Sequence, residues 1–338
     1  MKNRVFRYKK SFVLQKIIPV RLTNSHNVII ILVTGLPAPL NDVTQGRHFF
    51  IGDFYMSDVK KHQTYEEQVI KLRSRGCVIN DDIACKNILK HIGYYRLSAY
   101  FLPFKKDDDN YTEGLSFEKV CHIYEFDRKL RNLLFAAIEV IEVSLRARLA
   151  YFHSEKYGPL GYLSPDSFNS NHDAEKFREN IDREIENNKK VLFVRHHIDK
   201  YDGQFPLWVI CELFTFGMIS YFYNDLTTAD KKQFAGNDYK NMVSWLRCCT
   251  DLRNICAHYG RLYYRSFSAM PTGFYISESA KRRVWGAILS VKSLYPSAKK
   301  WNTEFMPALE ALFEEYNDDI DLYHLAFPSD WSLQLRKQ

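Results

Sequence analysis

A short run of residues, Arg253 to His258, combines side chains that together can cleave a phosphodiester bond. The run reads Arg-Asn-Ile-Cys-Ala-His. An imidazole can transfer protons near neutral pH, and a guanidinium fork suits phosphate oxygens. On a helix, Asn254 and His258 share a face, so the amide could fix the imidazole, and the long Arg253 side chain can reach the same pocket. We therefore predict Arg253, Asn254 and His258 as a catalytic set, with no metal ion and no cofactor.

The spacing of an arginine five residues before a histidine is weak by itself, because it occurs three times in the chain. Only the pair Arg253/His258 has a polar residue directly after the arginine and closes a predicted helix. For the pair Arg148/His153 we expect a structural or RNA-facing role, not a second catalytic centre. The three pairs are Arg21/His26, Arg148/His153 and Arg253/His258.

The segment after His258 alternates arginine and tyrosine residues. Guanidinium groups and aromatic rings suit phosphate contact and base stacking on single-stranded RNA. For the tyrosines, the alternative to RNA contact is packing against neighbouring helices. For Arg96, near the end of an earlier predicted helix, the alternative is a structural role. The predicted RNA-binding residues are Arg261, Tyr263, Tyr264, Arg265 and Arg96.

Glu142 and Arg146 lie four residues apart in a strongly apolar segment, one turn after Glu139. One interpretation is an ion pair at the surface, which contributes little to stability. The other is that the group points inward and orients Arg253. We predict Glu142 and Arg146 as supporting residues on the second interpretation.

The net charge of the chain is concentrated at one end. The 338 residues carry 47 Lys or Arg and 40 Asp or Glu, a formal charge of +7. Residues 1–55 account for +6 of this and the remaining residues for +1. Net charge therefore does not support a generally cationic nucleic-acid binder, and any RNA contact in the body must come from local clusters.

Composition narrows the class of protein. At 46% hydrophobic and 26% charged residues the chain is typical of a globular protein. No apolar run reaches the 18 or so residues that span a bilayer, so we predict no membrane association. Seven cysteines without C-x-x-C pairs favour free thiols and a cytoplasmic location.

Helical patterns dominate from Met56 onward and predict an all-α bundle. Capping signals are expected at Thr64, at Asn80–Asp82 and at Ser116, where the longest apolar periodicity begins and continues to about His153. Residues 206–223 predict one buried helix. A further helix is expected from about Tyr239 through His258, with two more from about Ser277 and from Thr303.

These patterns divide the chain into three parts. Residues 1–55 are expected to form a basic, poorly ordered extension, and translation from Met56 would remove it; an arm that binds an acidic partner is the alternative. Residues 56–115 would form an N-terminal helical subdomain. Residues 116–338 would form the main bundle, with a charged insertion at about 165–200.

Several segments together resemble the Abi-like proteins of the AbiD/AbiF abortive-infection group, which carry the R-N-x-x-x-H signature of HEPN ribonucleases. The resemblance covers about residues 60–331. Tyr263-Tyr264 departs from it, because relatives often carry Trp-Asn there. The segments are R-N-I-C-A-H-Y-G-R-L at 253–262, H-I-G-Y-Y-R-L-S-A-Y at 91–100, A-I-E-V-I-E-V-S-L-R at 137–146, P-L-W-V-I-C-E-L-F-T-F-G at 206–217 and A-F-P-S-D-W at 326–331.

The resemblance implies a HEPN-like helical bundle that dimerises so that two copies of the motif face each other. It also implies metal-independent RNA cleavage in phage defence, with His258 as general acid and base, Arg253 stabilising phosphoryl charge and Asn254 in a positioning role. A small RNA antitoxin is a further partner that the resemblance implies. The alternative is a non-catalytic RNA-binding or regulatory module with the same fold.

Overall fold

The computed structural model describes residues 60–336, and all of their regular secondary structure is helical apart from two isolated β-bridges. This confirms the predicted all-α class. Residues from His62 onward form one compact unit. The predictions for residues 1–55 and for a start at Met56 lie outside the described residues.

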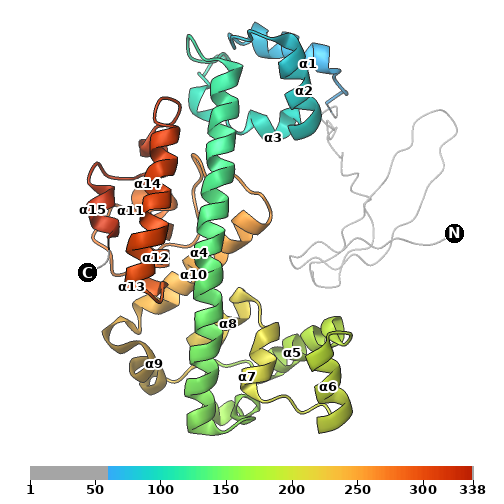
Figure 1. Cartoon of the computed structure of the whole chain (residues 1–338), viewed down its shortest axis with the longest axis vertical. Coiled ribbons are helices and arrows are strands. Elements are labelled where there is room, and N and C mark those ends of the chain that lie inside the picture. The colour runs from blue at the N-terminus through green and yellow to red at the C-terminus, as the bar shows by residue number, and fades with distance from the viewer. Residues whose placement is uncertain (1–59, 337–338) are drawn as a thin grey trace, which may run out of the picture. The chain divides into compact units, whose positions relative to one another are not determined.

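Fifteen α-helices follow one another in the described part of the chain, joined by turns, 3-10 segments and two longer connections, before α4 and after α10 (Figure 1). They are α1 (Tyr65–Ser74), α2 (Asp82–Ile92), α3 (Tyr94–Ser98), α4 (Phe117–Tyr157), α5 (Ala174–Asn188), α6 (Leu192–Tyr201), α7 (Leu207–Ile210), α8 (Phe216–Asp225), α9 (Thr228–Ala235), α10 (Asn241–Ala257), α11 (Glu278–Lys281), α12 (Val284–Leu294), α13 (Ala298–Lys300), α14 (Met306–Glu315) and α15 (Trp331–Leu335).

Helix α4 is the element on which the others are assembled. Ser116 caps it, accepting a hydrogen bond from the backbone N–H of Lys119 at 3.1 Å, and Gly158 follows its last residue at a φ of +81°. Its 41 residues extend for about 60 Å. The apolar positions predicted from periodicity form its buried face, and α7, α8, α10, α12 and α14 pack against it.

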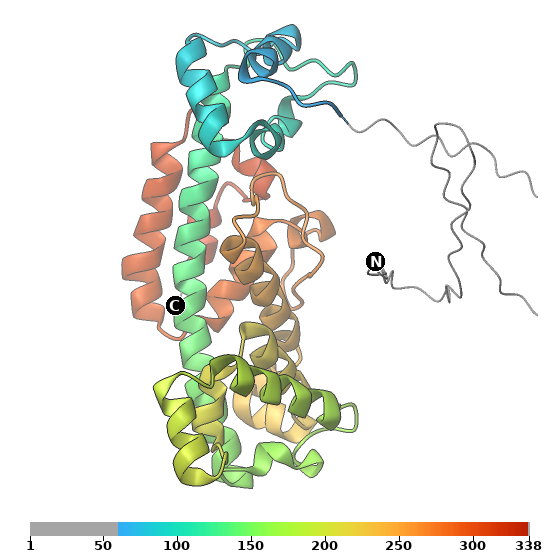
Figure 2. The same ribbon diagram turned by 90° about the vertical axis from the view of Figure 1, so that its right-hand side faces the viewer.

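Helices α1 to α3 lie at one end of α4 and α5 to α7 at the other (Figures 1 and 2). The predicted caps are confirmed at the first end. Thr64 and Glu67 form a reciprocal capping box, and the Asp81 carboxylate accepts from two N–H groups in the first turn of α2. At the second end, the charged segment forms α5 and α6, and only Ile181 of α5 is buried.

The single helix predicted for residues 206–223 is wrong, because the segment breaks near its middle. Helix α7 ends at Ile210, a 3-10 turn follows, and α8 begins at Phe216. Phe214 is extended, with a ψ of 128°, and the Thr215 hydroxyl caps α8 by accepting from Met218 N–H at 3.2 Å. An N-cap needs an extended backbone, so Thr215 starts a new helix instead of continuing the old one.

Helix α10 lies at the centre of the bundle, between α4, α8 and α12. Of the last five helices, α12 and α14 pack against α4, while α11 packs against α12 and α15 against α14 (Figure 1). The helix predicted to begin at about Thr303 begins earlier in the structure. Helix α13 starts at Ala298, and a π-helical turn joins it to α14. Because α4, α8 and α12 cover three sides of α10, the fourth side is the one that can reach solvent.

Candidate active site

The three residues predicted as a catalytic set lie at the C-terminal end of α10. Arg253 and Asn254 are in the last turns, and His258 directly follows the last helical residue. The end is a Schellman motif, in which Tyr259 N–H donates to Cys256 O at 3.1 Å and Gly260 N–H to Ile255 O at 2.8 Å. A Cβ at Gly260 would lie 3.0 Å from the Ile255 side chain and 3.2 Å from the Ile255 carbonyl oxygen, so a larger residue here would crowd the turn.

Asn254 and His258 are both exposed and lie on the same face of α10. Their backbones are joined, because His258 N–H donates to Asn254 O at 3.0 Å. Within residues 60–336 neither side chain has a hydrogen-bond partner, so the expected contact between the amide and the imidazole is not present in this structure. Both polar groups are therefore available to a substrate.

Arg253 points away from that face and lies against α4. Its side chain is 32% exposed, and Nε is 3.9 Å from Oε2 of Glu142. Its guanidinium carbon is 6.0 Å from the centroid of the Phe135 ring. None of the hydrogen bonds within the described residues uses its terminal nitrogens, so that end of the fork is available for an anion.

Glu142 lies between two guanidinium groups. Its Oε1 accepts from Arg146 at 2.6 Å, while Oε2 faces Arg253. Arg146 also donates to the Phe214 carbonyl at 2.6 Å, at the break between α7 and α8. The structure thus favours the inward-pointing interpretation for Glu142 and Arg146, whereas Glu139 is exposed.

A buried carboxylate that sequence reasoning missed, Asp127, holds the segment after His258. Its side chain is 0% exposed. It accepts from the backbone N–H groups of Leu262 and Tyr263 at 3.0 and 2.7 Å, and from the Tyr100 hydroxyl at 2.8 Å. Burial raises the pKa of Tyr100, which keeps this hydroxyl a donor. Asp127 also forms a buried ion pair with Arg131.

Two of the predicted RNA-binding arginines connect the segment after α10 to the residues that precede α4. Arg96 donates to Tyr259 O at 2.8 Å, and Arg261 donates to Ala99 O. Burial lowers the pKa of Arg261. Because both guanidinium groups hold backbone carbonyls, they have structural roles in this conformation, and only Arg96 remains exposed.

The structure corrects the prediction for Tyr263, whose ring is 1% exposed and packs edge-on against Phe126. The packing alternative therefore describes Tyr263, and no base can stack on it without unfolding the segment. Tyr264 is exposed and lies under the Arg283 guanidinium, 5.2 Å from its ring centroid. Arg265 is half-buried.

Arg148 and His153 do not meet. His153 is fully buried, stacks on Phe168 and has no hydrogen-bond partner for either ring nitrogen among the described residues. Burial lowers its pKa to about 4. Arg148 instead lies over the Phe234 ring, with its guanidinium carbon 4.7 Å from the centroid. His153 is therefore a core residue, which fits the structural role and not the RNA-facing one that the sequence left open for this pair.

The cysteines near the motif are also core residues, because Cys248, Cys249 and Cys256 are buried. Burial raises the pKa of Cys256 to about 12, so it is a thiol at neutral pH. Residues 60–336 contain no group of three or more His, Cys, Asp or Glu side chains placed to hold a metal ion. Among the same residues, no helix has both the length and the apolar character that a membrane span requires.

Comparison with known proteins gives one match. The family described as "Abi-like protein" matches residues 87–264, which is more than half of the 338-residue chain. The matched range begins in α2 and ends just after the segment that Asp127 holds, so it includes α4, the α7–α8 break and the whole of α10. No curated protein and no solved structure matches. The chain belongs to the Abi-like family.

Proposed function

We propose that this protein is an abortive-infection toxin of phage defence that cleaves RNA without a metal ion. Membership of the Abi-like family supports the defence role. The observation that carries the cleavage proposal is the end of α10. There, Asn254 and His258 expose an amide and an imidazole on one face of the helix, and Arg253 lies on the neighbouring side of the same helix, near Glu142 of α4.

The chemistry that these groups suit is attack by the RNA 2′-hydroxyl on the adjacent phosphate. His258 would accept the hydroxyl proton and later deliver a proton to the departing 5′-oxygen. Arg253 would stabilise the charge that builds on the phosphoryl oxygens, and Asn254 would position the phosphate. One P–O bond forms and one breaks, so the products carry a 2′,3′-cyclic phosphate and a 5′-hydroxyl.

A homodimer is part of this proposal, and an exposed apolar stripe on α4 supports it. Val140, Val143, Ala147 and Tyr151 recur at spacings of three and four, and all are exposed. Trp208 of α7 borders the same surface. Glu142 and Arg146 lie on the adjacent face of α4, so a second copy on this stripe would approach the Arg253 side of the motif.

A non-catalytic RNA-binding module is the second candidate. The observation that favours it is the absence, within residues 60–336, of a partner that orients the imidazole of His258. A general base is normally oriented by a neighbouring group. In a dimer the second copy could supply that group, which is why the catalytic proposal depends on dimerisation.

Expression of wild type, His258→Ala and His196→Ala tests the proposal. His196 is an exposed histidine of α6 and serves as the matched control. We expect wild type and His196→Ala to arrest growth and degrade RNA, and His258→Ala to do neither while accumulating to the same level. Equal RNA degradation by His258→Ala, or none by wild type, would reject the catalytic proposal.

A further inference from the structure

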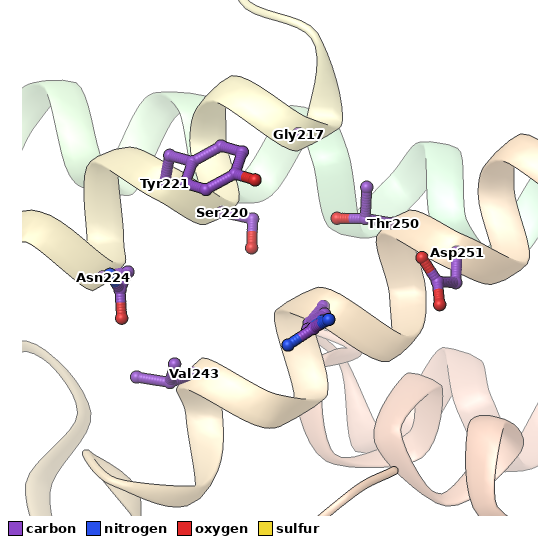
Figure 3. A pocket seen from close by; sticks show the side chains of 8 residues that line it. Gly217, Ser220, Tyr221, Asn224, Val243, Thr250 and Asp251 are labelled. Atoms are coloured by element: carbon purple, nitrogen blue, oxygen red, sulfur yellow. The ribbon is translucent and has the colours of Figure 1, made fainter. Parts of the chain in front are cut away.

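A polar groove between α8 and α10 has no role in the proposed chemistry. It encloses about 420 Å³, which is within the range of small-ligand sites. Ser220 and Tyr221 form one wall and Thr250 and Asp251 belong to the other, with Asn224 at one end (Figure 3). We infer that this groove binds a ribonucleotide of the substrate strand, away from the cleaved bond.

The groove and the proposed catalytic residues lie on the same face of α10. Arg247 lines the groove, and Asp251, Asn254 and His258 follow it at spacings of four, three and four residues, which places all four on one face of the helix. Along the axis, Arg247 is about 10 Å from Asn254 and about 16 Å from His258. Those distances correspond to about three to five stacked nucleotides.

The guanidinium of Arg247 is exposed, and within residues 60–336 it makes no hydrogen bond and no ion pair. The nearest carboxylate along the helix is Asp251, one turn later in the same groove. Other arginines near the motif are engaged, because Arg131, Arg146 and Arg261 hold carboxylates or carbonyls. A free guanidinium in a groove is suited to a phosphate, which it can bind with two parallel hydrogen bonds.

The other wall residues suit a base and a ribose. Tyr221 is 71% exposed, so its ring presents a face on which a base can stack. Ser220, Asn224 and Thr250 supply hydroxyl and amide groups. The Asp251 carboxylate accepts only long hydrogen bonds from the loop opposite, at 3.3 and 3.4 Å, and can accept a further one from a 2′-hydroxyl. A carboxylate that repels phosphate but accepts a 2′-hydroxyl favours RNA over DNA.

This inference rests on the proposed function for its substrate, but RNA binding can be measured apart from cleavage. The probe is a fluorescent 12-nucleotide RNA, titrated with His258→Ala and with His258→Ala carrying Arg247→Ala or Tyr221→Ala. Arg195→Ala in the same background is the control, because Arg195 is an exposed arginine of α6 without a partner in the described residues. Thermal unfolding verifies that each variant is folded.

We expect Arg247→Ala and Tyr221→Ala each to weaken RNA binding roughly tenfold, and Arg247→Ala to lower the salt dependence by about one counter-ion. The Arg195→Ala control should bind as its parent does. In the cleaving protein, Arg247→Ala should raise KM for the 12-nucleotide RNA and leave kcat unchanged. Cleavage of a dinucleotide, which is too short to reach the groove, should not change.

Unchanged RNA affinity in both groove variants would overturn the inference, as would equal losses in the Arg195→Ala control. These outcomes differ from a failure of the proposed function. If wild type binds RNA through Arg247 but never cleaves it, RNA binding by the groove is supported and the nuclease proposal is rejected. If wild type cleaves RNA and the groove variants bind RNA normally, the nuclease proposal is supported and RNA binding by the groove is rejected.

Discussion

Glu142 is the residue of α4 that lies against Arg253, the proposed catalytic arginine. It faces Arg253 on one side and Arg146 on the other, and its carboxylate is nearly enclosed. The contact with Arg253 is electrostatic, because Nε lies 3.9 Å from Oε2 and makes no hydrogen bond within residues 60–336. A carboxylate at this distance favours one placement of the guanidinium, so less ordering is needed when a phosphate binds. Glu142 touches no reacting atom and is therefore a positioning residue.

We predict that Glu142→Gln lowers kcat for RNA cleavage by about ten- to a hundredfold, because the arginine loses its charged anchor and shifts from its place. Glu139→Gln, one turn earlier on the exposed side of α4, should have no effect. Steady-state kinetics of both variants decides this. A loss confined to KM, or equal losses in the two variants, would contradict the positioning role.

At the scale of the element, the buried pair of Asp127 and Arg131 fastens α4 to the segment that follows α10. Four hydrogen bonds and the ion pair satisfy the Asp127 carboxylate, and Arg131 also reaches Gly260 O at 3.4 Å. His258 lies two residues before that glycine. Its position therefore depends on a carboxylate more than 130 residues earlier in the chain.

We predict that Asp127→Ala destabilises the protein by about 3–5 kcal/mol, because Arg131 would remain buried without a counter-ion. Glu125→Ala, which removes an exposed partner of Arg128 on the same helix, should cost less than about 1 kcal/mol. Urea unfolding measures both. Similar small losses in the two variants would show that the buried network does not hold the fold.

Local signals in the sequence predicted where helices begin and end better than whether a long apolar segment forms one helix or two. The caps at Thr64, Asp81 and Ser116 and the end of α10 depend on neighbouring residues only, and the structure confirms them. The break after α7 has a local part, the Thr215 cap of α8, which the apolar residues on both sides obscured, and a tertiary part. Arg146 of α4 bonds the freed Phe214 carbonyl, and no pattern within residues 206–223 reveals that contact.

At the candidate site, too, the sequence predicted what depends on neighbouring residues and missed what depends on tertiary contacts. Residue type and spacing were enough to place Asn254 and His258 on one face of α10. They could not show that Tyr263 is buried or that Arg261 holds a backbone carbonyl, because both depend on what Asp127 and the residues before α4 do. Asp127 itself carried no signal, since an acidic residue inside a long helical pattern is ordinarily exposed.

At the scale of the whole molecule, the buried His153 links stability to pH. Its pKa is about 4 in the folded protein, against 6.5 as the ordinary value. The unfolded chain therefore binds a proton at a pH where the folded chain does not. The stabilisation that this neutral histidine contributes is complete above pH 6.5 and is lost as the pH falls toward 4.

We predict that wild type loses about 2 kcal/mol more unfolding free energy than His153→Gln between pH 7 and pH 5. Glutamine has a similar size and does not titrate, so the difference isolates the histidine. Urea unfolding at the two pH values measures it. Parallel losses in the two proteins would mean that His153 takes up its proton in the folded state as well.

The apolar stripe on α4 predicts the oligomeric state. Val143 is 59% exposed in the single chain, so Val143→Glu should not disturb folding, yet it would place a charge inside a dimer interface. We expect this variant to be monomeric and inactive. Ile83→Glu, at an exposed position of α2, should remain dimeric and active. Light scattering with size-exclusion chromatography measures both, and a dimeric Val143→Glu would remove the stripe from the interface.

The proposed chemistry is tested most directly by the termini of the cleaved RNA. Purified wild type, incubated with RNA and an excess of EDTA, should release fragments with 2′,3′-cyclic phosphate and 5′-hydroxyl ends. A single 2′-deoxynucleotide at the cut position should abolish that cut, and His258→Ala should give no product. Fragments with 3′-hydroxyl and 5′-phosphate ends, or cleavage that EDTA prevents, would contradict attack by the 2′-hydroxyl at His258.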